Sequence, residues 1–313
     1  MKTWISRVFI VVALCVGFKA LSSFCHRQTG GFTLLGISSE RPFNPLWEAN
    51  PLSDRETQEV ISALNQKYHY LFSGGQAVVF ASEDGKYVIK FFDQSRLQPR
   101  FLARHLPPQF FNQKKLAKKV WKRQNKLDRD FSSYKLAFNE LKDETGLVLV
   151  HLNPTDWIER KLTLVDKIHI EHQIDLDAFE FILQKRAELV YPRLERLVKE
   201  GAQDGAKEAL SSILQLFAAR CQKGIDDSDP DLDKNFGFIG SQAVQIDTGR
   251  FTKHTLCNRY SERNAPIHAV QVKPPVIKES FKKWLSDLDP DLLSYFEAQY
   301  EQLCAAQAFS PQH

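Results

Sequence analysis

The hydrophobic pattern of the chain changes part-way along, and this change limits the possible folds more than any other feature of the sequence. From Leu71 to Phe92, turn residues alternate with β-branched and aromatic residues, which is typical of strands, and a long helical stretch follows from about Gln113 to Glu144. Three further apolar runs are typical of strands, and beyond Gln184 the spacing of Leu, Ile and Phe becomes helical. This order predicts an α+β fold with a β-rich N-lobe and an α-helical C-lobe.

We place the N-lobe at residues 54–186 and the C-lobe at residues 187–313. A chain of 313 residues with 43% hydrophobic and 26% charged residues is long enough for two such cores. A cleft between a β-rich lobe and an α-rich lobe is a natural nucleotide site. The formal net charge of +4 is too small by itself to indicate a nucleic-acid partner.

A glycine-rich turn stands at the start of the strand region, in the segment 73–80. A hairpin that covers phosphate groups needs residues without bulky side chains, so that backbone N–H groups can approach the anion. Gly74, Gly75 and Ala77 meet this requirement and are candidate nucleotide-binding residues. The turn is not a Walker loop, because no Gly-Lys-Ser/Thr follows it. A simple glycine turn is the alternative interpretation.

A lysine lies inside an apolar strand pattern, at Lys90 in the segment 87–92. Burial of an ammonium group costs free energy unless the group has a partner. Side chains alternate along a strand, so Val88, Lys90 and Phe92 share one face. Lys90 is therefore a candidate for binding an anion beneath the glycine-rich turn. An edge-strand lysine that reaches solvent is the alternative.

An Asp-rich loop extends from Gly224 to Asn235, and two short apolar runs then lead to Asp247. Hard cations such as Mg²⁺ take oxygen ligands and often use phosphate oxygens as the remaining ones. A hairpin between Asn235 and Asp247 would let their side chains converge as metal ligands. A calcium-binding or merely solvated acidic loop is the alternative, although the spacing does not fit an EF-hand.

The glycine-rich turn and the lysine strand together resemble the N-lobe of protein kinases. Phe72, Gly74, Ala77 and Val79 occupy the positions of the kinase glycine-rich pattern, with one of its three glycines kept. The segment 87–90 resembles the kinase strand that carries the ATP-binding lysine.

The acidic loop is more similar to the catalytic loop of phosphoinositide 3- and 4-kinases. Residues 224–227 fit the start of that loop, and residues 245–249 fit its metal-binding end. The sequence also departs from that pattern. The loop is longer, no His or Arg follows Asp227, and Thr248 replaces a phenylalanine.

The resemblance implies a phosphotransferase that uses ATP and Mg²⁺ and acts on a protein or a lipid/inositol hydroxyl. Lys90 would hold the α- and β-phosphates, and Asn235 and Asp247 would hold magnesium. Asp227 or Asp229 would accept the proton of the acceptor hydroxyl. Asp227 is preferred because it follows the opening motif, whereas Asp229 lies nearer the family's spacing to Asn235.

Active kinases also hold this lysine with a glutamate of the long helix. Glu140 is the candidate here, with Glu144 as a second one, and an exposed surface glutamate is the alternative. The lost glycines and the long acidic loop favour a competing interpretation: a catalytically weak pseudokinase that serves as a membrane-anchored nucleotide-binding or interaction module. The tripeptide 247–249 also matches aspartic proteases, but that chemistry needs a second such aspartate, which the chain lacks.

The N-terminal segment 1–25 is typical of a targeting element. Lys2 and Arg7 precede an apolar run over residues 8–18, which has the length of a signal-peptide core and is short for a membrane span. We expect an uncleaved signal anchor or a cleaved signal peptide, and hence a membrane-anchored or secreted protein with the membrane as a partner. A buried N-terminal helix is the alternative. The composition of residues 26–53 is typical of a linker.

A basic run occupies residues 96–129, with Asp128 as its acid. The run predicts either a solvated helix face or a surface for an anionic partner such as a membrane, a phosphoinositide or a nucleic acid. The cysteines show no CxxC spacing, so we expect reduced thiols and no zinc site.

Overall fold

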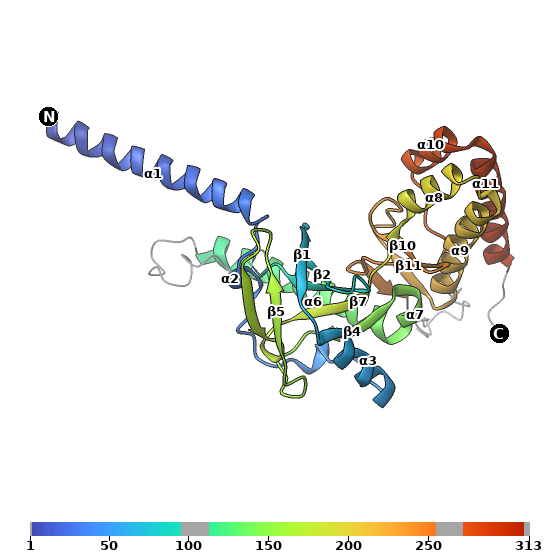
Figure 1. The fold of residues 1–313 in the computed structure, drawn as a ribbon, viewed down its shortest axis with the longest axis horizontal. Coiled ribbons are helices and arrows are strands. Elements are labelled where there is room, and N and C mark those ends of the chain that lie inside the picture. Colours follow the sequence, from blue (N-terminus) through green and yellow to red (C-terminus); the bar gives the residue numbers. More distant parts are fainter. Residues whose placement is uncertain (1, 95–112, 255–271, 310–313) are drawn as a thin grey trace, which may run out of the picture. The chain divides into compact units, whose positions relative to one another are not determined.

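The computed structural model describes residues 2–94, 113–254 and 272–309. The chain forms two compact units that interleave in sequence. Figure 1 shows their elements. The strand-rich unit consists of Met1–Phe43, Thr57–Arg123 and His151–Ile182, and the helix-rich unit consists of Asn44–Glu56, Gln124–Val150 and Leu183–His313.

Five strands form the body of the strand-rich unit. β1, β2 and β3 form an antiparallel meander, β5 runs parallel to β1, and β6 returns antiparallel to β5. The strand order is therefore β3-β2-β1-β5-β6. β4 and β7 extend this sheet in the order β4-β7-β3, and the division between the units falls within each of these two strands. The strand bounds are β1 (Tyr68–Ser73), β2 (Ala77–Ser82), β3 (Tyr87–Phe92), β4 (Leu147–His151), β5 (Lys161–Val165), β6 (Glu171–Asp175) and β7 (Phe181–Lys185).

The turn between β2 and β3 forms at Asp84-Gly85, as the sequence pattern predicts. Gly85 has φ 71°, a left-handed conformation that favours glycine. The Asp84 carboxylate accepts hydrogen bonds from the Ser82 hydroxyl at 2.7 Å and from the Lys86 N–H at 3.0 Å. These local contacts set a register in which Val79 lies opposite Lys90.

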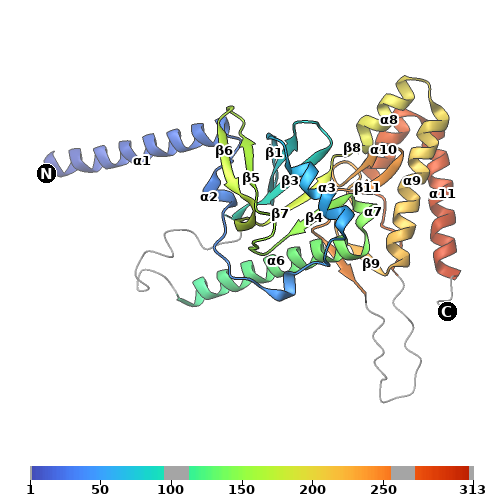
Figure 2. The same ribbon diagram turned by 60° about the horizontal axis from the view of Figure 1, so that its bottom comes forward.

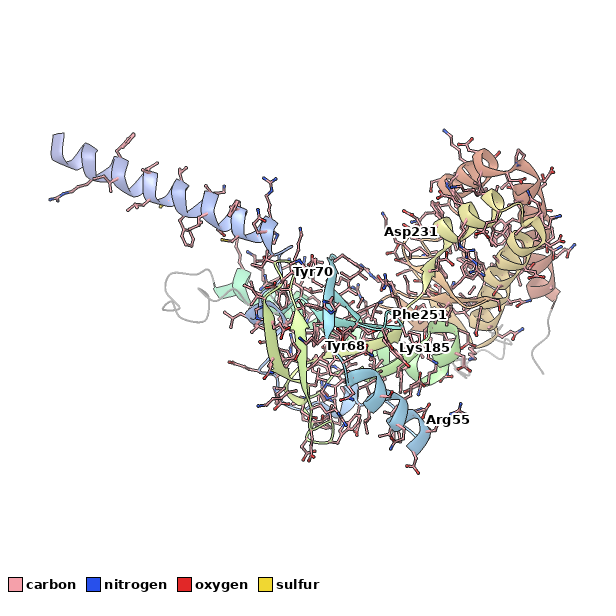
Figure 3. All side chains as sticks on the ribbon, viewed as in Figure 1. Arg55, Tyr68, Tyr70, Lys185, Asp231 and Phe251 are labelled. Carbon is pink, nitrogen blue, oxygen red and sulfur yellow. The ribbon has the colours of Figure 1, made fainter. Side chains whose placement is uncertain are left out.

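The core of the strand-rich unit is built from aromatic side chains. Phe80 and Phe91 lie on adjacent strands with their rings edge to face at 6.1 Å, and Phe32 packs against Phe80 at 5.1 Å. Tyr68, labelled in Figure 3, is fully buried, and its hydroxyl donates to the Ala63 carbonyl at 2.9 Å. The helices of this part are α1 (Lys2–Gln28), α2 (Leu34–Ile37), α3 (Asp54–Leu64, shared with the other unit) and the short 3-10 turn η3 (Leu176–Ala178).

Helices dominate the other unit, together with short strands. β8 and β11 flank β10 in one small sheet, and β9 pairs with β12 in another. The elements are η1 (Pro45–Trp47), α6 (Gln113–Glu140, shared with the first unit), α7 (Lys142–Thr145), β8 (Glu188–Leu189), α8 (Val190–Lys199), α9 (Gln203–Gln222), β9 (Ile225–Asp227), β10 (Phe236–Ile239), β11 (Gln242–Gln245), β12 (Phe251–Lys253), α10 (Glu279–Leu288) and α11 (Pro290–Phe309).

The core of the helix-rich unit lies around α9. In Figure 2, α9 and α11 run side by side, and the two helices pack together with α10. Leu210, Ile213 and Phe217 recur at helical spacing on α9 and are fully buried. Phe217 meets Phe236 of β10 edge to face at 5.6 Å. This packing fixes β10, and therefore the loop that precedes it.

The predicted α+β class, with a β-rich N-lobe and an α-helical C-lobe, is confirmed by these two units. The long helix ends close to the predicted place. Gly146 adopts φ 62° immediately after α7, which is a left-handed helix end.

The N-terminal helix corrects one prediction. α1 contains the expected apolar run, but within the described parts of the chain no helix combines the length and apolar character that a bilayer crossing needs. The apolar run over residues 8–18 is shorter than the roughly 20 residues required, and Lys19 follows it directly. The transmembrane and signal-anchor predictions for residues 1–25 are therefore wrong.

The basic run 96–129 lies partly outside the described residues. Its described part belongs to α6, where Val120 and Trp121 are exposed among the basic side chains.

Candidate functional site

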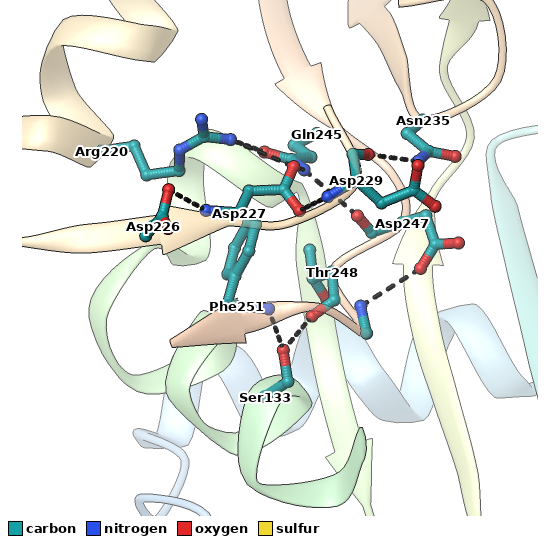
Figure 4. A network of polar contacts seen from close by, with 11 residues as sticks. Ser133, Arg220, Asp226, Asp227, Asp229, Asn235, Gln245, Asp247, Thr248 and Phe251 are labelled. Atoms are coloured by element: carbon teal, nitrogen blue, oxygen red, sulfur yellow. Dashed lines mark hydrogen bonds and ion pairs between the residues drawn. The ribbon is translucent and has the colours of Figure 1, made fainter. Parts of the chain in front are cut away.

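The candidate site is built on the loop that links β9 to β10 and on the turn that follows β11, all within the helix-rich unit. Figure 4 shows Asp229, Asn235 and Asp247 with their side chains on the same side of this loop, while Asp227 points away toward Arg220. β9 and the β10–β11 hairpin hold the two segments side by side, because the Ile246 N–H donates to the Asn235 carbonyl at 2.8 Å.

Asn235 is the centre of this arrangement. Its carbonyl also accepts from the Asp247 N–H at 3.4 Å, and its side-chain Nδ2 donates to the Asp229 carbonyl at 2.8 Å. Because Nδ2 is directed at the backbone of the loop, Oδ1 is the side-chain atom of Asn235 suited to a cation. The structure thus brings Asn235 and Asp247 together, as the hairpin argument from the sequence requires, and places Asp229 beside them.

Asp247 is half-buried and lies at the start of a tight turn. Its Oδ1 accepts from the Gly249 N–H at 3.1 Å. Burial and the Asp247 carboxylate raise the pKa of Tyr134, so this phenol stays protonated and serves as a hydrogen-bond partner of Asp247. A Cβ on Gly249 would lie 3.3 Å from the Tyr134 hydroxyl, so the turn and the phenol fit closely.

Ser133 of α6 fixes the same turn from the other side. Its hydroxyl donates to the Thr248 carbonyl and accepts from the Phe251 N–H at 2.6 Å. One buried side chain therefore satisfies two backbone groups on either side of Gly249. Sequence reasoning missed Ser133, because a serine within a helical pattern gives no sign of such a role.

Asp227 and Asp229 have opposite environments, although they are two residues apart. Asp227 is 6% exposed, whereas Asp229 is exposed to solvent. The Asp227 Oδ1 accepts from the Asp229 N–H at 2.9 Å, and its Oδ2 accepts from Gln245 Nε2 at 2.6 Å. The Asp229 side chain is thus available to a substrate, and that of Asp227 is enclosed by protein.

Arg220 completes this enclosure. Its side chain is 2% exposed, and Nη1 lies 2.7 Å from Gln245 Oε1 and 3.3 Å from Asp227 Oδ2. Burial raises the pKa of Asp227 and lowers that of Arg220, while the charge of each partner opposes the shift of the other. Arg220 and Asp227 therefore form a buried ion pair, and the side-chain amide of Gln245 hydrogen-bonds to both of them.

The oxygen ligands of the site fit magnesium. Asn235 Oδ1 and the Asp247 carboxylate are hard donors, and magnesium is commonly held by one or two protein oxygens together with substrate phosphates. Among the residues that the structure describes, no group of three or more His, Cys, Asp and Glu side chains is placed to hold a metal by itself.

The remaining predicted residues lie in the strand-rich unit. Lys90 is half-buried on β3, Gly74 and Gly75 lie in the turn between β1 and β2, and Ala77 is the first residue of β2. The Gly74 N–H donates to the Ala77 carbonyl at 2.8 Å, which closes the turn. The turn therefore joins β1 to β2, and Lys90 lies on β3, the strand that pairs with β2 in the same meander.

Glu140 lies at the end of α6 and is engaged with other partners. Its Oε1 accepts from Lys253 Nζ at 2.6 Å, and its carbonyl accepts from Lys223 Nζ at 2.5 Å. Asp130, earlier on the same helix, is 4% exposed and lies one turn before Tyr134. Its carboxylate pairs with Arg129 at 2.9 Å and with Lys126 at 3.8 Å.

No protein-family model matches the chain, and no curated protein matches its sequence. Solved structures give distant similarities. The complex of Rv3197 with erythromycin from Mycobacterium tuberculosis is 14% identical with a TM-score of 0.30, and the match covers 79% of this chain and 67% of that one. WbdD with the kinase inhibitor LY294002 is 13% identical with a TM-score of 0.29, and the match covers 78% of this chain and 46% of that one.

A further structure, described as the bifunctional kinase-methyltransferase WbdD, is 14% identical with a TM-score of 0.27. The match covers 76% of this chain and 43% of that one, so this chain spans less than half of the WbdD chains. Because these identities and TM-scores are low, we draw nothing about activity or substrate from them.

Proposed function

We propose that the protein is a kinase-like phosphotransferase that uses ATP with Mg²⁺. The observation that carries this proposal is the convergence of Asp229, Asn235 and Asp247 on one side of the β9–β10 loop, with two of the three held by backbone hydrogen bonds. One side chain in this group can accept a proton, and two can hold a cation that carries phosphate. Positioning and charge neutralisation are the main needs of phosphoryl transfer.

Asp229 is the proposed general base. It would accept the proton of an acceptor hydroxyl while the new O–P bond forms and the bond from the γ-phosphorus to the leaving oxygen of ADP breaks. Asn235 and Asp247 would hold magnesium, which neutralises phosphate charge. The exposure of Asp229, against the enclosure of Asp227, supports this choice over the preference that the sequence motif gave to Asp227.

Lys90 is the proposed anchor of the α- and β-phosphates, with Gly74, Gly75 and Ala77 as the turn that covers them. The acceptor is a protein hydroxyl or a lipid/inositol hydroxyl.

The engagement of Glu140 by Lys253 also favours a second candidate, a nucleotide-binding module with weak turnover. In that case ATP would bind and catalysis would be slow or absent. The two candidates differ in turnover and agree in nucleotide binding, so binding and turnover must be measured separately.

Binding is tested by thermal denaturation of the full chain with millimolar Mg-ATP. A ligand present at 100 times its Kd stabilises by about 2.7 kcal/mol, which is a readily measured rise in Tm. We expect this rise to disappear in Lys90→Met and in Asp247→Ala. Lys86→Met is the matched control, because Lys86 is exposed on the same hairpin. The absence of any rise in the wild type at millimolar Mg-ATP contradicts both candidates.

Turnover is tested by ADP release in the presence of protein acceptors and of soluble inositol phosphates. We expect Asp229→Asn to keep the Mg-ATP stabilisation and to lose about 10²–10⁴-fold in kcat, which is the usual contribution of a positioned base. Full binding without turnover in the wild type would favour the nucleotide-binding module. Equal turnover in the wild type and in Asp229→Asn would exclude Asp229 as the base.

A further inference from the structure

The buried cluster of Arg220, Asp227 and Gln245 has no place yet in the proposed reaction. All three side chains are almost inaccessible to solvent, and they come from α9, β9 and β11 respectively. An ion pair of this kind is costly to bury, and apolar residues of similar size often give equal stability. Its presence directly beneath the candidate site therefore calls for a role besides stability.

Two hydrogen bonds lead from this cluster into the site. Asp227 Oδ1 accepts the backbone N–H of Asp229 at 2.9 Å, and Gln245 Nε2 donates to the backbone carbonyl of Asp247 at 3.3 Å. The same Nε2 also donates to Asp227 Oδ2 at 2.6 Å. One amide group thus connects the segment that carries Asp229 to the segment that carries Asp247.

Arg220 decides the orientation of that amide. Its Nη1 donates to Gln245 Oε1 at 2.7 Å, so Nε2 must face Asp227 and the Asp247 carbonyl. A reversed amide would bring the NH₂ group against the guanidinium, donor to donor. Arg220 thereby acts on two residues of the site without touching either.

We propose that Arg220, Asp227 and Gln245 form a positioning clamp that fixes the distance between Asp229 and Asp247. This inference rests on the proposed function and deepens it: Asp227 is a positioning residue, and the base is Asp229. The clamp holds the general base and a metal ligand in one geometry, and displacement of about 1 Å at such a site costs about 10²-fold in rate.

Hydrogen exchange tests the clamp without any nucleotide. In the full chain, the double variant Arg220→Leu/Asp227→Leu replaces the ion pair with apolar residues and removes the acceptor of the Asp229 N–H. We expect the Asp229 amide to exchange about tenfold faster than in the wild type. Asp233→Asn, a change in the same loop at a residue that does not contact the cluster, is the matched control and should leave the rate unchanged. An unchanged rate in the double variant overturns the clamp.

Turnover separates positioning from a merely structural role. The double variant leaves no buried charge unpaired, so it should lose less stability than Asp227→Leu alone, and the remaining loss comes from the Gln245 amide, which loses two hydrogen-bond partners. We expect it to keep Mg-ATP binding and to lose about 10²-fold in kcat. Wild-type kcat in a folded double variant overturns the proposal. If exchange responds as expected but the wild type neither binds Mg-ATP nor turns over, the proposed function fails while the clamp stands as a structural finding.

Discussion

Replacement of Arg220 alone is the sharpest test of how the helix-rich unit is held together. The guanidinium is 2% exposed and lies 3.3 Å from the Asp227 carboxylate, whose side chain is 1% exposed. Arg220→Leu removes the positive charge and leaves Asp227 buried without an ionic partner. Gln245 also loses the donor that orients its amide.

The expected loss of stability is large. Removal of one partner from a buried ion pair costs about 3–5 kcal/mol, because the remaining charge stays desolvated. For a domain of this size, each kcal/mol lowers Tm by about 2–4 °C, so the variant should melt about 10 °C below the wild type at pH 7.

The loss should also depend on pH. Burial already raises the pKa of Asp227, and without Arg220 this pKa must rise further. A carboxyl whose folded pKa exceeds its unfolded value binds more protons when folded, so its stabilising effect is full below about pH 3.9 and is lost as pH rises through the folded pKa. Acidification from pH 7 to pH 5 should therefore reduce the difference between Arg220→Leu and the wild type.

Urea denaturation of the full chain at pH 7 and pH 5 measures both effects. Arg196→Leu is the control, because Arg196 is 42% exposed and its ion pairs with Glu188 and Glu200 are of the surface kind that contribute about 0–1 kcal/mol. A loss in Arg220→Leu no larger than in Arg196→Leu would refute the reasoning. So would a difference from the wild type that grows on acidification.

Three further changes test other buried groups of the protein by denaturation of the full chain. Ser133→Ala should cost about 2 kcal/mol of stability, because two backbone groups lose a hydrogen-bond partner. The control Ser294→Ala, at an exposed serine, should change stability little. Equal losses of stability in the two variants would contradict the role of Ser133. Gly237→Ala places a Cβ 2.7 Å from the Glu188 carbonyl and should cost about 1–3 kcal/mol of stability. The control Gly205→Ala, in helix α9, should be neutral or stabilising. A larger loss of stability in Gly205→Ala than in Gly237→Ala would refute this reasoning. Burial lowers the pKa of His151, so the unfolded chain binds more protons than the folded one and stability should fall as pH drops below about 6.5. The loss of stability on acidification should be smaller in His151→Gln than in the wild type. An equal loss in both would exclude His151 as the cause.

Local features of the fold could be predicted from the sequence because their causes are local. Asp84-Gly85 forms its turn because glycine accepts φ 71° and the preceding carboxylate binds the backbone around it. Gly146 ends the long helix region for the same kind of reason. The convergence of Asn235 and Asp247 likewise follows from a hairpin that the apolar runs between them specify.

The assignment of roles within the acidic loop could not be predicted in this way. Asp227 and Asp229 are chemically identical, and a motif cannot tell which of them faces solvent. The structure separates them because Arg220 is buried against Asp227. Glu140 was likewise assigned by its position on the long helix, and its actual partner, Lys253, lies more than a hundred residues away.

The sequence by itself determined the α+β class, the turn at Asp84-Gly85 and the residue types of the candidate site, since periodicity, turn chemistry and side-chain chemistry act over a few residues. Only the tertiary structure decided which aspartate is enclosed, which is exposed, and which acid of α6 is engaged elsewhere. The physical reason is that burial and charge pairing depend on side chains brought together from distant parts of the chain, and desolvation makes that choice energetically decisive.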